Sequence, residues 1–172
     1  MSYHNEVWLL ASKPVADKVF KIIAGLDPTQ GSQFDTIKVS PSGKTYMFHA
    51  YTWWNEFDDN DKLPKAINEL LDAVSDRDDD EEGYTFVRNG DERDDWSRRV
   101  ENPGILEGEL YSDGCSEEEF ELWNDVDADG TIHEIDKHEL CNNKWIDFQK
   151  AIKAFGMKTV LPLDKVIAPI EE

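Results

Sequence analysis

Hydrophobic and polar residues follow strand and helix periods through the first 90 residues. The segment Glu6 to Ala11 is short and apolar, which is typical of a buried strand. After Pro14, apolar side chains recur at helical spacing and predict a helix with one buried face that ends near Gly25. Residues 34–39 and 44–53 are rich in strand formers and flank a turn, so they predict a hairpin.

A second helix and a fourth strand complete this pattern. Leucine, isoleucine and valine recur at helical spacing from Leu63 to Val74, and Tyr84 to Arg88 reads as a short strand. The order strand, helix, strand, strand, helix, strand is the split βαβ, or ferredoxin-like, order. The sequence therefore predicts an α+β fold in which residues 1–100 form an antiparallel sheet with two helices on one face.

The pattern is less regular beyond residue 100. Residues 91–103 are charged and end in Asn-Pro-Gly, which indicates a loop or a domain boundary. We expect residues 101–172 to form an irregular α+β extension packed on the first domain. Its predicted elements are a strand at 105–111, helices at 116–123 and 144–155, and extended segments at 160–163 and 166–170.

Charge narrows the classes of function. Among 172 residues there are 38 acids and 18 bases, a net charge of −20, and residues 56–139 alone hold 30 acids and eight bases. This balance excludes a general nucleic-acid binder and disfavours an anionic membrane surface, because both need lysine and arginine. No apolar run is long enough to span a bilayer, and the first residues lack a secretory pattern, so we expect a cytoplasmic protein.

The acidic runs have two interpretations. One is a solvated face that keeps the protein soluble, and the other is a negative surface that meets a basic partner. On the second interpretation we expect the contacts to come from two runs, Asp78, Asp79, Asp80, Glu81 and Glu82, then Asp91, Glu92, Asp94 and Asp95. Four arginines are embedded among acids and are expected to pair with acids, namely Arg88, Arg93, Arg98 and Arg99.

One segment has the spacing of a metal-binding loop. Residues 125–136 read DVDADGTIHEID, which resembles the calcium loop of EF-hands and, through its final Asp, that of dockerin domains. The expected oxygen ligands are Asp125, Asp127, Asp129, Thr131 and Asp136. The alternative is an acidic Asp-Gly turn without a metal. We expect no cofactor to be required, with Ca²⁺ as the possible exception.

Catalytic constellations are missing from the sequence. No nucleophile, base and orienting group occur at a known spacing, so the sequence favours a protein that is not an enzyme. A group of aromatic residues suits core packing or a hydrophobic contact better than a nucleic-acid stacking platform, because no basic side chains accompany it. The group consists of Tyr46, Phe48, Trp53 and Trp54.

The segments MSYHNEVWLLASK, HAYTWWNEF and GYTFVRNGDERDD resemble a loose family of small phage and prophage proteins over residues 1–95. The matching positions are Tyr3, Trp53 or Trp54, Phe86, Arg88, Gly90, Asp91 and Asp95. The resemblance carries no activity. It implies an accessory protein that acts inside a bacterial host.

Together these features give two functional hypotheses. The first is an acidic phage protein that binds a basic surface of a host protein, in the manner of DNA-mimic inhibitors of host defence, without contacting nucleic acid itself. The alternative is a calcium-stabilised protein-binding module built around residues 125–136.

Overall fold

A computed structural model describes residues 4–92, 94–110 and 120–135 of the chain. The chain divides into two compact units, Met1–His133 and Glu134–Glu172, and the fold described below is that of the first. The helix expected at 144–155 and the extended segments expected after it lie outside the described residues.

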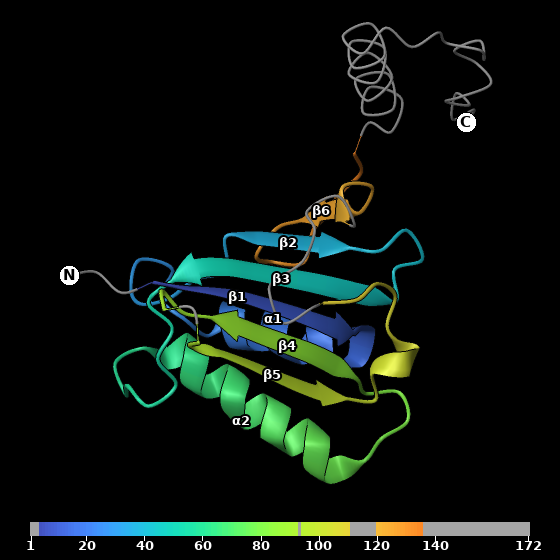
Figure 1. The fold of residues 1–172 in the computed structure, drawn as a ribbon. Coiled ribbons are helices and arrows are strands. Elements are labelled where there is room, and N and C mark those ends of the chain that lie inside the picture. The colour runs from blue at the N-terminus through green and yellow to red at the C-terminus, as the bar shows by residue number, and fades with distance from the viewer. Residues whose placement is uncertain (1–3, 93, 111–119, 136–172) are drawn as a thin grey trace, which may run out of the picture. The chain divides into compact units, whose positions relative to one another are not determined.

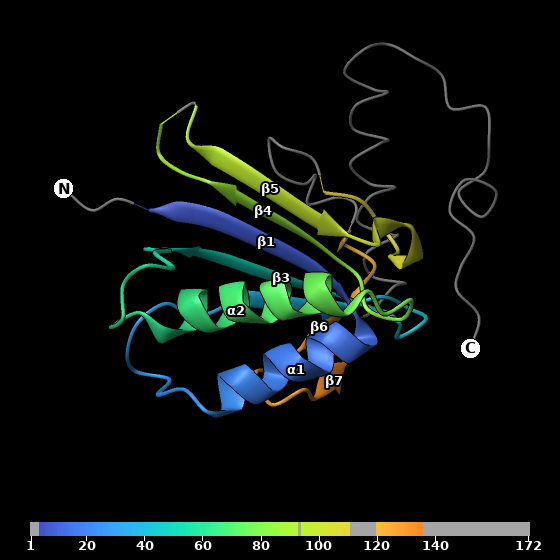
Figure 2. The same cartoon turned by 90° about the horizontal axis from the view of Figure 1, so that it is seen from below.

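Seven strands form one antiparallel sheet in the order β5-β4-β1-β3-β2-β6-β7 (Figure 1). Two helices of the described residues lie side by side on one face of this sheet (Figure 2). The prediction of an α+β fold with two helices on one face is therefore confirmed. The elements are β1 (Asn5–Ser12), α1 (Lys13–Ala24), β2 (Thr36–Val39), β3 (Thr45–Thr52), α2 (Lys62–Arg77), β4 (Tyr84–Asn89), β5 (Trp96–Glu101), the 3₁₀ turn η1 (Pro103–Ile105), β6 (Asn124–Val126) and β7 (Ile132–His133).

Strand β1 lies in the middle of the sheet and is buried on both faces. Leu9 stands opposite Phe48 of β3 and Phe86 of β4, and all three belong to the core beneath the helices. The alternate residues Trp8 and Leu10 are buried on the other face. A strand covered on both sides needs apolar residues at successive positions, which explains the unbroken apolar run that marks it in the sequence.

The helices begin and end where the sequence predicts. Pro14 stands in the first turn of α1, and the cap residue Gly25 donates its backbone N–H to the carbonyls of the last turn. The apolar residues at helical spacing turn toward the sheet and are buried, among them Val19 of α1 and Ile67 of α2. Neither described helix combines the length and the hydropathy that a bilayer span requires.

The face of the sheet opposite the helices carries a smaller core. It is closed in part by chain that follows β5, which contributes three buried side chains. This second core consists of Trp8, Leu10, Met47, Val87, Leu110, Phe120 and Trp123. Apolar residues on both faces of β1, β3 and β4 are thus removed from water, and the sheet forms a middle layer rather than one outer wall.

The prediction of a charged loop at 91–103 is wrong over residues 96–101, which form strand β5. This strand pairs with β4 along its whole length and forms the edge of the sheet. Its residues alternate between exposed and half-buried, but arginine occurs on both faces, at Arg98 and Arg99. The sequence therefore lacks the apolar alternation by which a strand is recognised.

Two further predictions beyond residue 100 need correction. The expected strand at 105–111 is the end of η1 followed by irregular chain as far as Leu110. The helix expected at 116–123 is a turn over its described part, Phe120 to Trp123, where the Trp123 N–H donates to the Phe120 carbonyl. Leu110, Phe120 and Trp123 of these segments are buried in the second core, which accounts for part of their hydrophobicity without a strand or a helix.

Gly83 stands where the chain after α2 passes close to the chain after β5. A Cβ at this position would lie 2.6 Å from the backbone oxygen of Asn102 and 3.0 Å from Ile105. We expect Gly83→Ala to lower the free energy of unfolding by about 1–3 kcal/mol in urea denaturation, because backbone must move to admit the methyl group. Gly104→Ala is the matched control, since a Cβ there meets nothing within 4 Å. Equal effects of the two substitutions would contradict this packing.

Candidate functional site

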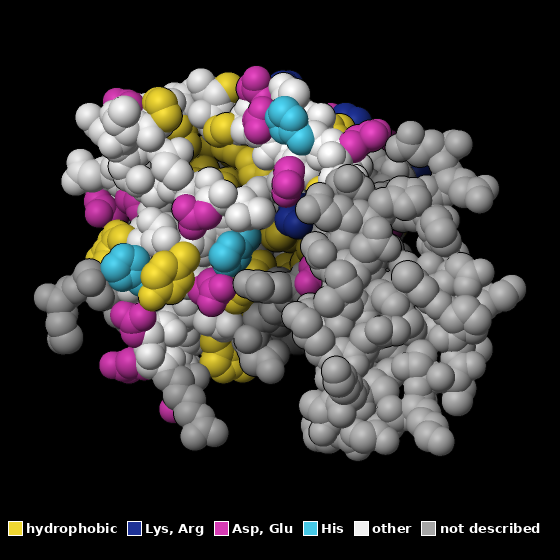
Figure 3. All heavy atoms as spheres, turned by 90° about the horizontal axis from the view of Figure 1, so that it is seen from above, with side chains coloured by type: hydrophobic (Ala, Val, Ile, Leu, Met, Phe, Trp, Pro, Cys, Tyr) yellow, Lys and Arg dark blue, Asp and Glu magenta, His cyan; other side chains and the backbone are white. Residues whose placement is uncertain are grey.

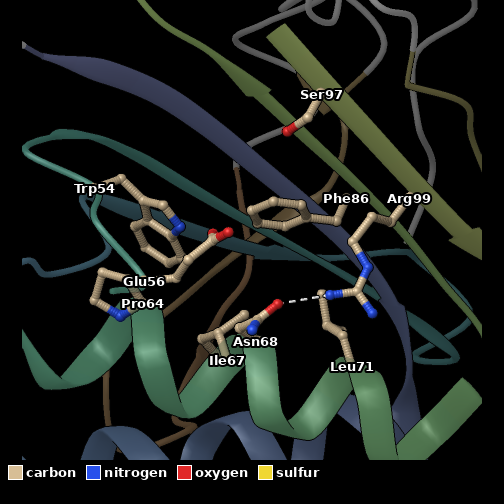
Figure 4. A pocket seen from close by; sticks show the side chains of 9 residues that line it. All are labelled: Trp54, Glu56, Pro64, Ile67, Asn68, Leu71, Phe86, Ser97 and Arg99. Carbon is tan, nitrogen blue, oxygen red and sulfur yellow. Dashed lines mark hydrogen bonds between the residues drawn. The ribbon is translucent and has the colours of Figure 1, made fainter. Parts of the chain in front are cut away.

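A cleft with a volume of about 170 Å³ lies between α2 and the strands β4 and β5 (Figure 4). Its walls combine apolar and polar side chains in about equal measure. Ile67 and Leu71 come from α2, Phe86 comes from β4, and Trp54 comes from the segment that joins β3 to α2. These four side chains are also members of the main core, so the folding of the sheet and the helix forms the cleft in advance.

Two aromatic rings form one end of the cleft. The ring centroids of Trp54 and Phe86 lie 6.0 Å apart with their planes inclined at 39°. Each residue is only 5% exposed, which leaves part of each ring to face the cleft while the rest is packed in the core. Rings held in this way offer a rigid surface with negative π-faces.

Arg99 of β5 reaches across the cleft to α2. Its guanidinium donates hydrogen bonds to Asn68 Oδ1 at 2.7 Å and to Asp72 Oδ1 at 2.6 Å, and it lies over the ring of Tyr84. Burial alone would lower the pKa of Arg99, but the hydrogen bond and the charge of Asp72 outweigh it and raise the pKa. The group therefore stays charged, and its charge is balanced within the protein.

Glu56 is the acidic residue of the cleft. In Figure 4 its carboxylate lies near the two aromatic rings, on the side of the cleft away from Arg99. Within the described part of the chain, no hydrogen bond or ion pair engages this half-buried carboxylate. Glu56 is thus the charged group of the cleft that has no partner of opposite charge among the described residues.

The polar groups of the cleft can take part in binding a ligand. Besides Glu56 and Arg99, its polar groups are the Asn68 amide, which accepts from Arg99, and the Ser97 hydroxyl. The residues that line it include no histidine, cysteine or lysine that would activate Ser97 as a nucleophile. These groups can hold a ligand by charge, hydrogen bonds and aromatic contact.

The two predicted acidic runs stand at opposite ends of β4. Asp78 to Glu81 are exposed in the loop between α2 and β4, and Asp91 to Asp95 lie in the turn between β4 and β5. The six residues of β4 separate the runs by about 20 Å at ~3.3 Å per residue. The structure does not bring the nine predicted contact acids into a single site.

The prediction of Glu82 as a contact residue needs correction, because its side chain is buried and stabilises the fold. Its carboxylate accepts hydrogen bonds from Lys18 of α1 and from Arg77 at the end of α2, and the residue is 6% exposed. Burial raises the pKa of Glu82, but the hydrogen bonds and charges of Lys18 and Arg77 outweigh it, so the pKa lies below its usual range. This group ties both helices to the start of β4.

The run between β4 and β5 is partly engaged with the sheet. Asp95 accepts from Arg88 at 2.8 Å, which confirms the predicted pairing of that arginine, and Asp91 accepts the backbone N–H of His4 at 3.1 Å. Glu92 and Asp94 are exposed. The same end of the sheet carries exposed aromatic residues, namely Tyr51, Trp53, Phe57 and Trp96. Phe57 is 87% exposed, an unusual position for a large apolar side chain.

On the face that Figure 3 displays, aspartate and glutamate side chains are scattered among histidine, apolar and uncharged ones. The described acids of this view do not gather into one continuous field. Among the aromatic residues weighed as a stacking platform, Tyr46, Phe48 and Trp54 are buried in the main core, as the core interpretation predicts.

The calcium-loop segment forms a hairpin in its described part. Asp125 lies in β6, pairs in register with His133 of β7, and contacts Lys38. Gly130 turns the chain with φ +92°, and the Thr131 N–H donates to Asp129 Oδ1. No group of three metal-binding side chains occurs among the described residues, and Asp136 lies outside them.

Hydrogen bonds within this hairpin occupy the acids expected to bind calcium. Asp127 Oδ2 lies 2.7 Å from His133 Nε2, and this hydrogen bond raises the pKa of His133. The hydrogen bond that Asp129 accepts from Thr131 lowers the pKa of Asp129. The described residues form an Asp-Gly turn, and Asp136, the expected last ligand of the calcium loop, lies outside them.

Sequence analysis did not identify the cleft. The sequence predicts core packing or a hydrophobic contact for Trp54 and an ion pair for Arg99, and it does not distinguish Glu56 from the other acids of residues 56–139. The pairing of Arg99 with Asp72 confirms one of these assignments. The missing element was β5, because a loop at 96–101 would have placed neither Ser97 nor Arg99 opposite α2.

Comparison with known proteins adds no relative. The chain matches no protein-family model, no curated protein and no solved structure.

The ion pairs of Glu82 predict a pH-dependent contribution to stability. A carboxyl group whose pKa is lowered by folding stabilises the protein above its unfolded pKa, near 4.5, and loses this effect as the pH falls through the folded value. We expect Glu82→Gln to lower the free energy of unfolding by about 1–2 kcal/mol at neutral pH, since Lys18 and Arg77 remain partly exposed to water.

The difference between Glu82→Gln and the parent protein should shrink when urea denaturation is repeated below the unfolded pKa of the carboxyl group. Glu81→Gln is the matched control, because it removes the same charge from the exposed neighbour and should change stability by less than about 0.5 kcal/mol. A loss for Glu82→Gln that stays constant across this pH range would contradict the role of its ionised form.

If residues 125–133 form an acidic turn without a metal, millimolar calcium leaves the melting temperature unchanged. The measurement should be repeated well above the pKa of His133, where the neutral imidazole no longer holds Asp127 by charge and calcium meets the least competition. A rise in melting temperature that Asp125→Ala abolishes would overturn the hairpin interpretation and establish a calcium loop.

Proposed function

We propose that this chain is a non-enzymatic acidic protein that binds a basic surface of another protein. The observation that supports this proposal is the imbalance of charge left after internal pairing. The described residues include 28 acids and 11 bases, a net charge of −17. Seven of the 11 bases already form ion pairs with acids, namely Lys13, Lys18, Lys38, Lys65, Arg77, Arg88 and Arg99.

Most of the described basic residues are therefore paired with acids of the same chain, while most acids of the two runs remain exposed at the surface. Asp78 to Glu81 are exposed, and so are Glu92 and Asp94. A surface of this kind attracts lysine and arginine, accelerates association, and loses affinity as salt is added. A basic protein that normally meets phosphates is the matching partner.

The end of the sheet near the β4–β5 turn is the better candidate for the contact. It combines the acids Asp91, Glu92 and Asp94 with exposed aromatic side chains, and aromatic residues provide much of the energy at protein interfaces. The loop with Asp78 to Glu81 has acids alone. An acidic and aromatic surface favours a folded basic partner over a free polycation.

The resemblance to phage proteins and the charge together support a setting for this function. We propose a phage accessory protein that acts in the host cell, where it engages a nucleic-acid-binding protein of defence or regulation as a DNA mimic. The fold proposed for it is ferredoxin-like. The strand order β4-β1-β3-β2 at the centre of the sheet supports this assignment, with β5, β6 and β7 as additions. The calcium-stabilised module remains the second candidate, supported by the spacing of Asp125, Asp127 and Asp129.

Two variants with equal charge changes test this function. One carries Asp91→Asn, Glu92→Gln and Asp94→Asn, and the other carries Asp78→Asn, Asp79→Asn and Asp80→Asn. Tagged protein would be exposed to nuclease-treated bacterial lysate at low and high salt, and retained proteins identified by mass spectrometry. We expect one basic protein that is released by salt, and we expect the first variant to lose it while the second retains it.

Other outcomes of this experiment are equally informative. Equal losses in both variants would show that net charge alone causes retention and would overturn the assignment to the β4–β5 end. Retention that neither variant nor salt reduces would contradict the proposed electrostatic contact altogether.

A further inference from the structure

We infer that the cleft between α2 and the strands β4 and β5 is a pocket for one cationic side chain, an arginine or a lysine presented by the basic partner. This inference rests on the proposed function and adds to it the site where the partner is anchored. Three features of the described residues support it. They are the unbalanced Glu56 carboxylate, the two aromatic walls, and the position of the cleft beside the exposed aromatic residues.

The size of the cleft limits its occupant. Its volume of about 170 Å³ is below the roughly 300–1,000 Å³ that is usual for sites of drug-sized ligands. A single long side chain is of suitable size, whereas a helix or a strand is too large. Lysine and arginine also have aliphatic stems, and Ile67 and Leu71 offer apolar surface along which such a stem can lie.

The aromatic walls favour a cation. Trp54 and Phe86 line one end of the cleft, near the Glu56 carboxylate (Figure 4). A guanidinium or ammonium group at this end gains both a carboxylate partner and contact with the negative face of a ring. Because the walls exclude water in part, these interactions are stronger than at an open surface.

Arg99 is the feature that would favour an anion instead. Its guanidinium is held by Asp72 and Asn68, however, so the pair Arg99 and Asp72 adds no net charge to the cleft. An anion would have to compete with Asp72 and would enter against the net charge of −17 of the described residues. A cation meets Glu56 with no competitor among those residues.

The surroundings of the cleft provide a surface for the rest of the partner. Trp53 and Phe57 are the chain neighbours of Trp54 and Glu56, and both are exposed aromatic residues. Trp96, the neighbour of Ser97 on β5, faces the other side of the sheet, because successive side chains of a strand alternate between its faces. A buried anchor within a ring of contacts that exclude water is the usual arrangement of an interface hot spot.

The test uses the full chain and a defined probe, N-acetyl-arginine methylamide, with the N-acetyl-citrulline analogue as its uncharged counterpart. Nuclear magnetic resonance would follow the indole N–H of Trp54 during titration. We expect saturable shifts with a dissociation constant near the millimolar range for the arginine probe, and binding at least about tenfold weaker for citrulline. The N-acetyl-lysine analogue then tells whether the pocket prefers a guanidinium or an ammonium group.

Three variants make this test specific. Glu56→Gln should weaken binding of the arginine probe by about tenfold or more, because the charged partner is lost. Glu69→Gln removes the same charge from an exposed position of α2 that does not line the cleft, and it should leave binding unchanged. Ser97→Phe should block the cleft from the edge strand without altering the core, and the melting temperature of each variant verifies that it is folded.

Equal affinity of Glu56→Gln and Glu69→Gln, or equal affinity for arginine and citrulline, would overturn the pocket. This failure is distinct from a failure of the proposed function. If the basic partner is still captured in a salt-sensitive manner and the probe does not bind, the pocket is wrong and the function stands. If the probe binds at Trp54 and no partner is retained, the proposed function fails.

Discussion

The structure depends on the removal of β1 from water on both of its faces. This strand supplies Leu9 to the core beneath the helices and Leu10 to the core on the opposite face, and both side chains are fully buried. Two faces can be covered only if different segments cover them. The helices α1 and α2 cover one, and the chain after β5 covers part of the other. The order of elements around β1 follows from that requirement.

The burial of β1 on both faces also restricts where charged residues can lie. Buried ionised groups are costly unless they are paired, so the charged residues must occupy helix surfaces, loops and the outer strands. The buried Glu82 is consistent with this rule, because Lys18 and Arg77 both pair with it where α1, α2 and β4 meet. Strand β5 is the one long strand at an edge, and it carries Arg98 and Arg99 on opposite faces. Charged residues of this kind also keep an edge strand from pairing with other chains.

The sequence predicts most of the central fold, since the first four strands and both helices have clear periods. It does not predict β5, because arginine on both faces hides the alternation, and it mistakes irregular chain at 105–110, of which only Leu110 is buried, for a strand. Local periodicity reports burial but not the partner that causes it. The cleft is lost for the same reason. Glu56 and Arg99 are 43 positions apart, and only the pairing of β5 with β4 places them on one cavity.

The separation of the acidic runs has a consequence for how the protein meets a partner. At physiological salt the Debye length is about 8 Å, whereas β4 holds the two runs about 20 Å apart. Each run therefore acts on its own surroundings, and the large net charge is felt as separate local fields. In the cleft, the balance of Arg99 by Asp72 leaves Glu56 to set the sign of the local potential. In the proposed function, total charge brings a basic protein near, and the local arrangement of one carboxylate and two rings selects the side chain that is held.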